Sequence, residues 1–312
     1  MKMVTLGRTG IVTTAAGLGC GGHSQLGLKM YGEAHAVEIV RKAYDLGVRM
    51  FDTATTYNTE SVVGMGLTGI PRDSYVISTK FPVMEEWRDN CVENFHNTLN
   101  ASLRALKTDF IDVYNFHAVE PYDYEDVKER LVPEMFKARQ QGKIRFIGIT
   151  EHFVTDTSHK TLNAALTDDI FDVIMVGYNL LNPSAAKTIL PRAIKQNVGV
   201  QCMFAVRRAL SDINQMKDDI QRVLDNNQGG AGLEATYDAL DFLVESSAAT
   251  SIMDAAYRFC THTTGVHITL SGTSNITHLE DNLHSLNSPP LPAEILDKLE
   301  DMFGLSDCIS GQ

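Results

Sequence analysis

The feature that most constrains the fold is a regular alternation of short apolar runs with helical patterns along the whole chain. The clearest helical pattern steps by three and four residues through Val92, Phe95, Leu99, Leu103 and Leu106. Near-continuous apolar runs are typical of parallel strands that are buried on both faces. We therefore predict strands at residues 15–19, 48–52, 75–79, 111–116, 144–149, 172–176, 198–202 and 266–270.

Eight such strands with intervening helices and right-handed crossovers predict an α/β fold of the (β/α)8, or TIM-barrel, type. An open doubly wound sheet is the alternative, but no G-x-G-x-x-G motif follows the first predicted strand. The 312 residues contain no linker, internal repeat or low-complexity tract, so we predict one domain over residues 1–312.

Two segments depart from the alternation. Residues 6–10 precede the first predicted strand, and we expect a small N-terminal hairpin there that plugs the bottom of the barrel. Residues 211–247 form a long insertion after the seventh strand, with a predicted mobile turn at 226–230, NNQGG. Long insertions on compact barrels often serve as lids, and a surface helix pair is the other interpretation.

Charge and composition narrow the classes of partner. Lys and Arg number 27 against 39 Asp and Glu, so the net charge is −12 and the chain repels nucleic acid and anionic membranes. An anionic cofactor would need a local group of donors. The start lacks a signal-peptide core, no apolar run is long enough for a bilayer, and the five cysteines are scattered without a C-x-x-C. We expect a soluble cytoplasmic protein, with a homo-oligomer left open.

Polar residues at predicted strand ends indicate the chemistry, because active sites of such barrels lie at the C-terminal ends of the strands. Asp52, Lys80 and His117 end the second, third and fourth strands, and Tyr57 follows Asp52 by five residues. A tyrosine titrates at about pH 10 in water, and a neighbouring ammonium lowers that pKa. With an aspartate holding the lysine and a neutral imidazole holding the substrate oxygen, the set favours carbonyl reduction.

Several motifs in order resemble the aldo-keto reductases. The segment FDTATTYN at 51–58 is followed by ESVVG at 60–64, and STK, NFH and GKIRFIGI occur at 78–80, 115–117 and 142–149. LGRTG at 6–10 resembles the amino-terminal hairpin of that family, and the likeness runs from about residue 3 to residue 303. The resemblance implies a catalytic tetrad of Asp52, Tyr57, Lys80 and His117, with Tyr57 as general acid and a nicotinamide dinucleotide bound without a Rossmann motif.

The predicted cofactor is NADP(H), with NAD(H) as the alternative. Residues 271–282, SGTSNITHLEDN, resemble the segment that holds the adenosine 2′-phosphate in the family, at a loop leading into a helix N-terminus. Gly272 and His278 replace the Lys and Arg of many members. This form is closer to members resembling potassium-channel β subunits and bacterial aldose or galactose dehydrogenases.

Around the nicotinamide the chain departs from the family pattern. Thr150-Glu151 stands in place of Ser-Asn, and Met175 in place of a glutamine. Met203, next to Phe204, replaces the aromatic that stacks on the ring. We expect Arg207 and Arg208 to grip the pyrophosphate, and Glu151 either to contact the cofactor or to support Lys80. The full predicted cofactor set is Gly21, Gly22, Thr150, Glu151, Tyr178, Met203, Arg207, Arg208, Gly272, Thr273, Ser274, His278, Asp281 and Asn282, with no metal ligand.

The sequence thus predicts an NAD(P)(H)-dependent reductase or dehydrogenase for an aldehyde, ketone or sugar. The short tail after residue 303 favours an open pocket for polar substrates such as sugars or lactols. His152 and His23 are either solvent-exposed or shape the pocket, and Trp87 either packs its loop or lines the substrate mouth. We expect structural roles for His159, His262 and His267. The alternatives are a metal-dependent barrel hydrolase or isomerase using Asp52, His117, Glu151 and His152, a redox-sensing cofactor-binding subunit, or transient oxidation within an elimination or epimerisation.

Overall fold

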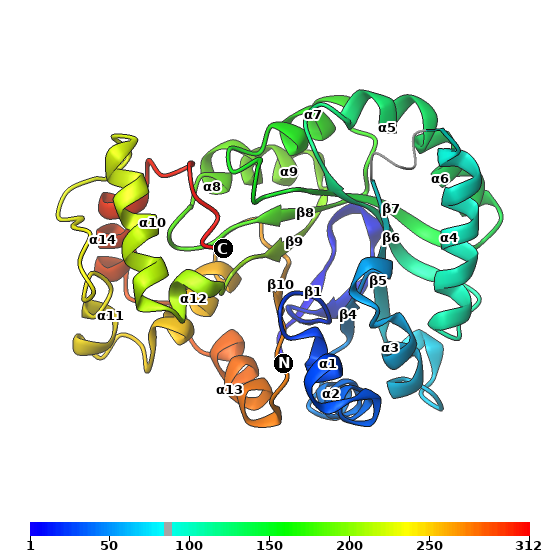
Figure 1. Cartoon of the computed structure of the whole chain (residues 1–312), viewed down its shortest axis with the longest axis horizontal. Helices are drawn as coiled ribbons and strands as arrows, with labels where there is room; N and C mark the ends of the chain where they lie inside the picture. Colours follow the sequence, from blue (N-terminus) through cyan, green and yellow to red (C-terminus); the bar gives the residue numbers. More distant parts are fainter. Residues whose placement is uncertain (84–88) are drawn as a thin grey trace.

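The computed structural model describes residues 1–83 and 89–312, and Trp87 lies outside this part of the chain. Eight parallel strands close into a barrel in the order β10-β3-β4-β5-β6-β7-β8-β9, which confirms the predicted (β/α)8 architecture (Figure 1). Their bounds are β3 (Ala16–Gly19), β4 (Met50–Asp52), β5 (Val76–Pro82), β6 (Ile111–Val119), β7 (Ile144–Glu151), β8 (Val173–Gly177), β9 (Gly199–Met203) and β10 (Ile268–Ser271).

The main helices lie outside the barrel, as Figure 1 shows, and cover the outward faces of the strands. Apolar side chains at helical spacing, such as Phe95 and Leu99, pack against strand residues to form this outer core. The longer helices are α2 (Glu33–Asp45), α3 (Glu60–Gly66), α4 (Cys91–Ala105), α5 (Tyr124–Arg130), α6 (Val132–Gln140), α7 (Lys160–Asp168), α9 (Leu190–Gln196), α10 (Ile213–Asp225), α12 (Ile252–Thr261), α13 (Ile276–Asn287) and α14 (Ala293–Phe303).

An antiparallel hairpin closes the N-terminal end of the barrel, as predicted. Strand β1 (Met3–Thr5) pairs with β2 (Val12–Thr14), and residues 6–10 form the turn between them. Leu6 and Ile11 are buried and pack on an apolar cluster that also contains residues from five barrel strands, namely Met50, Val76, Val113, Val173 and Ile268. The turn therefore plugs the barrel floor and leaves the opposite end for chemistry.

The strands β5 and β6 run further than the sequence pattern predicts, so Lys80 and His117 lie within strands. Strand side chains alternate between the two faces. In β5, Thr79 hydrogen bonds to Glu60 on the outer helix α3, whereas Lys80 bonds to Asp52 of the neighbouring strand. This alternation places charged groups inside the barrel and apolar groups such as Phe81 against α4.

The insertion after the seventh strand builds a second core beside the barrel. Helix α10 packs with α11 (Phe242–Glu245) and α14, the group at the left of Figure 1, around buried residues such as Ile220, Leu243 and Leu299. A turn begins at residue 226, as predicted, and the Gly230 N–H at its end donates to Met302 O of α14 at 3.0 Å. The mobility of this segment stays a prediction. A lid role for 211–247 stays a prediction.

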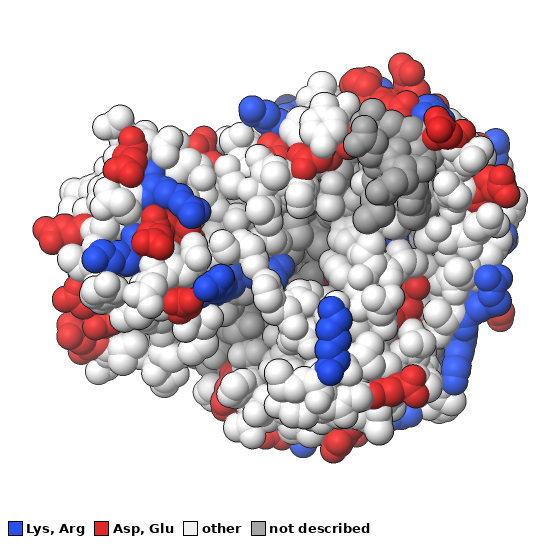
Figure 2. All heavy atoms as spheres, in the orientation of Figure 1, with Lys and Arg blue, Asp and Glu red and all other residues white. Residues whose placement is uncertain are grey.

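Charge lies mainly at the periphery of the molecule. Figure 2 shows most acidic groups toward the outline of the face seen in Figure 1, while a few Lys or Arg side chains lie among uncharged residues in its middle. Of the helices in residues 1–83 and 89–312, none has both the length and the apolar character that crossing a bilayer requires.

Candidate active site

A buried ion pair forms the base of the site at the C-terminal ends of β4 and β5. Lys80, which is fully buried, places its Nζ 2.6 Å from Asp52 Oδ2 and donates to Thr53 O at 2.7 Å. Ser78 donates to the other Asp52 oxygen at 2.8 Å. Because each charge is hydrogen-bonded, the buried pair is held in one geometry inside the barrel.

Tyr57 and His117 lie directly above this ion pair. Tyr57 ends the short 3₁₀ turn η3 (Thr55–Tyr57) after β4, and its Oη lies 3.2 Å from His117 Nε2. The ammonium of Lys80 is 5.1 Å from the centre of the phenol ring. Thr56 Oγ1 lies 3.4 Å from the other ring nitrogen of His117. The structure therefore brings Asp52, Tyr57, Lys80 and His117 to one place, at the strand ends where the sequence puts them.

The protonation states of these groups follow from burial and from the ion pair. Burial lowers the pKa of His117 to about 3, with Lys80 acting in the same direction, so the imidazole is neutral. Burial alone would lower the pKa of Lys80, but the Asp52 carboxylate outweighs it and the pKa is raised.

Tyr57 departs from the expected shift. Burial raises the pKa of Tyr57, and the opposing field of Lys80 only partly offsets this effect. The expectation of a lowered phenol pKa therefore does not hold in this structure. The phenol carries its proton at neutral pH, as a proton donor must.

A layer of polar side chains inside the barrel supports the ion pair. Asn115 donates to Ser78 Oγ at 3.1 Å, and Ser78 Oγ lies 3.5 Å from Gln201 Oε1. Ser78 and Asn115 belong to the STK and NFH motifs, but the sequence-based prediction assigns no site role to them or to Gln201. The available signal was strand alternation, because Ser78 and Asn115 each precede a site residue, Lys80 or His117, by two positions.

Two glycines after β3 border the site. The Tyr57 ring lies against Gly21 so closely that a Cβ at Gly21 would overlap it. A Cβ at Gly22 would be 3.1 Å from Arg207 Nη1. Both predicted glycines therefore lie at the mouth, where a side chain would displace Tyr57 or crowd Arg207.

The two arginines after β9 differ in their surroundings. Arg207 is half-buried with its Cζ 3.8 Å above the centre of the Phe204 ring. Burial lowers the pKa of Arg207. Arg208 is exposed and pairs with Asp212 at 3.2 Å. Of the two, Arg207 faces the site, since its Nη1 lies beside Gly22 at the mouth.

The predicted phosphate segment lies between β10 and α13. The Asn275 side chain caps α13 by accepting from the N–H groups of Thr277 and His278 at 2.8 and 3.2 Å. Ser274 O lies 2.7 Å from His35 Nε2, which fixes the loop on α2. Thr273 is buried and Ser274 is half-buried, while the remaining predicted residues are exposed or half-buried on the loop and first turns: Gly272, His278, Asp281 and Asn282.

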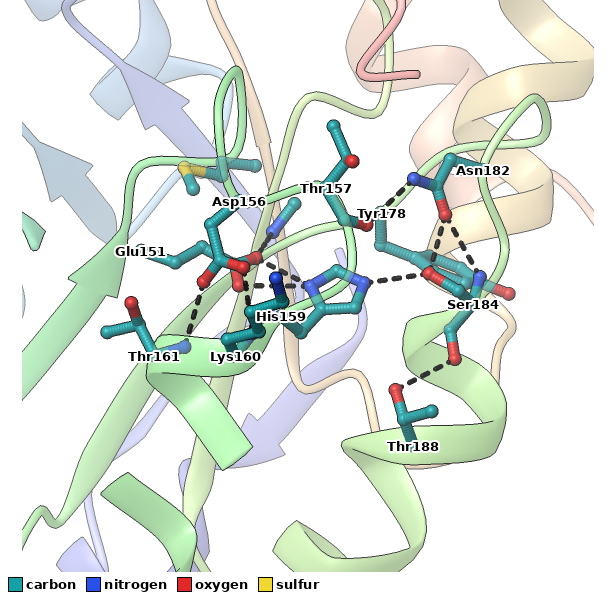
Figure 3. Close-up of polar contacts among 12 residues, drawn as sticks. Glu151, Asp156, Thr157, His159, Lys160, Thr161, Tyr178, Asn182, Ser184 and Thr188 are labelled. Atoms are coloured by element: carbon teal, nitrogen blue, oxygen red, sulfur yellow. Dashed lines mark hydrogen bonds and ion pairs between the residues drawn. The ribbon is translucent and has the colours of Figure 1, made fainter. Parts of the chain in front are cut away.

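Glu151 has a partner that the sequence analysis missed. Its carboxylate is buried against His159, with His159 Nδ1 2.9 Å from Oε1, and it accepts from the Gly177 N–H at 2.8 Å (Figure 3). His159 Nε2 lies 3.0 Å from Ser184 Oγ. Glu151 therefore does not support Lys80. It follows Thr150 on the opposite face of β7 and points outward to the start of α7.

Other predicted cofactor residues lie in mixed positions. Thr150 accepts a hydrogen bond from the backbone N–H of Ala118 at 2.7 Å, which fixes the end of β6 next to His117. Tyr178 stacks on Phe259 of α12 at 5.4 Å, and its hydroxyl lies 3.1 Å from Thr263 Oγ1. Tyr178 thus packs behind the barrel and is not brought to the site. Met203 is half-buried at the end of β9.

The four residues considered for a metal all have other partners. Asp52 holds Lys80, Tyr57 Oη lies beside His117, Glu151 binds His159, and His152 pairs with Glu120. Within the part of the chain that the structure describes, no three His, Cys, Asp or Glu side chains are grouped to hold a metal ion.

Comparison with known proteins identifies the family of the chain. The sequence model of the Aldo/keto reductase family matches residues 18–302, and the chain belongs to that family. L-galactose dehydrogenase from Arabidopsis thaliana is 30% identical over 208 residues, and the NADH-specific methylglyoxal reductase from Escherichia coli is 26% identical over 226 residues. The alignment with L-galactose dehydrogenase covers 64% of this chain and 64% of that protein. The alignment with the methylglyoxal reductase covers 66% of each chain.

Solved structures share the whole fold. An aldo-keto reductase from Bacillus halodurans, in its holo form, has a TM-score of 0.72 and 23% identity over 99% of this chain and 98% of its own. One from Klebsiella pneumoniae, in complex with NADP and acetate, has a TM-score of 0.70 and 21% identity over 99% of this chain and 97% of its own. At such identity they show that the barrel is common to these proteins.

Proposed function

We propose that the chain is an NAD(P)(H)-dependent oxidoreductase that transfers a hydride between nicotinamide and the carbonyl carbon of an aldehyde, ketone or sugar. The observation that carries the proposal is the 3.2 Å approach of Tyr57 Oη to His117 Nε2 above the buried Lys80–Asp52 pair. The hydroxyl of a protonated phenol and a nitrogen of a neutral imidazole lie next to each other, so one substrate oxygen can accept a hydrogen bond from both.

Tyr57 acts as the general acid in reduction. Its raised pKa keeps the proton on Oη until negative charge develops on the substrate oxygen, which then takes that proton. Lys80 stabilises the phenolate that remains, because its ammonium is 5.1 Å from the ring and Asp52 keeps it charged. In the oxidative direction the same phenolate removes the proton from the alcohol.

His117 orients the carbonyl. Its pKa of about 3 excludes a role as an acid at neutral pH, so the imidazole works as a neutral hydrogen-bond partner. The T-shaped contact with the Tyr57 ring, at 5.3 Å and 87°, fixes the imidazole plane. The substrate oxygen is thus held between Tyr57 and His117. The distance between these two side chains is set by β4, which Tyr57 follows, and by β6, which contains His117.

The cofactor we propose is NADP(H), with NAD(H) as the alternative, and it would supply the hydride. One feature fits an anionic dinucleotide: residues 272–275 lead into the N-terminus of α13, where backbone N–H groups favour a phosphate. Thr273, Ser274 and His278 would hold the adenosine end. The Gly21 and Gly22 backbone, Thr150, Met203 and Arg208 would border the rest.

A nucleotide titration followed by a turnover screen tests this function. Protein fluorescence is measured against NADPH and NADH, and the tighter nucleotide is then used with a panel of aldehydes, ketones and sugars at neutral pH. We expect saturable binding of at least one nucleotide and carbonyl-dependent oxidation of its reduced form. Absence of binding, or turnover that EDTA abolishes, would contradict the proposal.

A further inference from the structure

Arg207 is a half-buried cation at the mouth of the site. Across residues 1–83 and 89–312, no hydrogen bond or ion pair joins its guanidinium to another residue, and its Cζ lies 3.8 Å from the centre of the Phe204 ring. The adjacent Arg208, by contrast, pairs with Asp212. Keeping a guanidinium partly desolvated without a counter-ion costs free energy, which an incoming anion recovers. In a chain of net charge −12 this is a specific feature.

The support beneath Arg207 is built to hold it in place. Phe204 has φ +69, a left-handed backbone conformation that is uncommon for a bulky residue and costs free energy. Its ring meets Phe153 edge-on at 5.4 Å, and Phe153 stacks on His159 at 5.4 Å and 11°. His159 is fixed in turn by Glu151 (Figure 3). The buried Glu151–His159 pair thus anchors an aromatic shelf on which the guanidinium lies.

Arg207 and the reaction centre flank the same two glycines. Tyr57 lies against Gly21, and Arg207 Nη1 lies beside Gly22. Neighbouring Cα atoms are about 3.8 Å apart, so the phenol and the guanidinium lie beside consecutive residues of one loop. The charge of Arg207 also reaches the Tyr57 hydroxyl and opposes the rise of its pKa.

We propose that Arg207 binds a carboxylate on the substrate, so that the preferred substrates are anionic carbonyl compounds such as oxo acids or sugar acids. This inference rests on the proposed function. The cofactor diphosphate is the other source of such an oxyanion. In the cofactor, a ribose and most of the pyridine ring separate the diphosphate from the reacting carbon. In an oxo acid or sugar acid, only a short carbon chain separates the carboxylate from the carbonyl. The second arrangement fits better with an Arg207 that lies near Tyr57. Guanidinium binds carboxylate through two parallel hydrogen bonds.

Matched substrate pairs test the proposal. Steady-state kinetics would compare succinic semialdehyde with butanal, and glucuronate with glucose, for wild type, Arg207→Gln, Arg207→Lys and the control Arg104→Gln, an exposed residue on α4. We expect wild type and the control to favour the acid by at least about tenfold in kcat/KM. Arg207→Gln should lose most of that preference, chiefly through KM, with butanal changed less than about twofold. Arg207→Lys should keep part of it, because the charge remains.

Binding in the absence of substrate separates the two anion sources. We expect NADPH to bind Arg207→Gln with a Kd within about twofold of wild type. A Kd weakened tenfold, with both members of a pair slowed equally, would assign the guanidinium to the diphosphate and overturn the proposal. Equal use of acid and neutral substrates by wild type would also overturn it. A protein that binds neither nucleotide and turns over neither substrate would instead refute the proposed function itself.

Discussion

Replacing Lys80 by methionine removes the cation at the base of the site while nearly keeping its volume. Lys80 is fully buried and donates to Asp52 and Thr53 O at 2.6 and 2.7 Å. The variant leaves the Asp52 carboxylate in the barrel interior with only the Ser78 hydroxyl as a side-chain donor. Breaking a buried pair from one side costs about 3–5 kcal/mol, so we expect that loss in the free energy of unfolding at pH 7.

The loss should depend on pH with a definite sign. Burial raises the pKa of Asp52, and Lys80 now opposes that rise. Without Lys80 the pKa of Asp52 in the folded state rises further above its unfolded value. The protonated carboxyl then stabilises the fold fully below the unfolded pKa, and this contribution disappears as pH rises through the folded pKa. The variant should therefore lose less stability at pH 5 than at pH 7.

Urea unfolding followed by circular dichroism at both pH values measures this. The exposed Lys29→Met serves as the matched control, with a change expected within about 0.5 kcal/mol. The double variant Asp52→Asn/Lys80→Met should regain part of the loss, because no unpaired charge stays buried. A Lys80→Met loss below about 1 kcal/mol, or one that grows toward acid pH, would refute the argument for a charged buried pair.

Two further predictions concern proton supply and cofactor choice. Because burial raises the pKa of Tyr57 and lowers that of His117 to about 3, kcat for carbonyl reduction should stay flat from about pH 6 to 9. A stopped-flow series over this pH range measures kcat. An inflection near pH 6.5 that His117→Ala abolishes would contradict the prediction. His278→Arg at the start of α13 should tighten NADPH about tenfold through one charge-assisted contact to the 2′-phosphate and leave NADH unchanged; equal effects on both nucleotides in a fluorescence titration would place His278 away from that phosphate.

Strand order and the tetrad could be predicted from sequence because both follow from local signals. Near-continuous apolar runs mark buried parallel strands. Asp52 ends β4, and Lys80 and His117 lie two residues before the ends of β5 and β6. Parallel strands of a barrel place their C-terminal ends at one rim, so neighbouring strand ends imply neighbouring side chains. The packing of Leu6 and Ile11 under the barrel follows from similar reasoning, since an apolar hairpin needs a surface to bury.

Two predicted cofactor residues lie away from the site because their side chains are on the other face of the barrel wall. Glu151 and Tyr178 stand at strand ends like the tetrad, but alternation turns them outward to His159 and to Phe259 of α12. A shift of one residue along a strand moves every side chain to the opposite face of the sheet. The short apolar runs do not determine which residues face the barrel interior. Residues 226–230 have the composition of a mobile turn, yet Gly230 is hydrogen-bonded to Met302 of α14. A contact between segments so distant in the chain cannot be predicted from the local sequence pattern.

Pre-steady-state turnover of Tyr57→Phe tests the central claim most directly. The substitution removes only the hydroxyl that lies 3.2 Å from His117 Nε2. With saturating reduced nucleotide and a carbonyl that wild type turns over, we predict a rate constant lower by about 10²–10⁴. The nucleotide Kd should stay within about twofold, and Tyr237→Phe, at a half-exposed tyrosine of the insertion, should match wild type. Hydride transfer by Tyr57→Phe within about tenfold of the wild-type rate would contradict the assignment of Tyr57 as the proton donor.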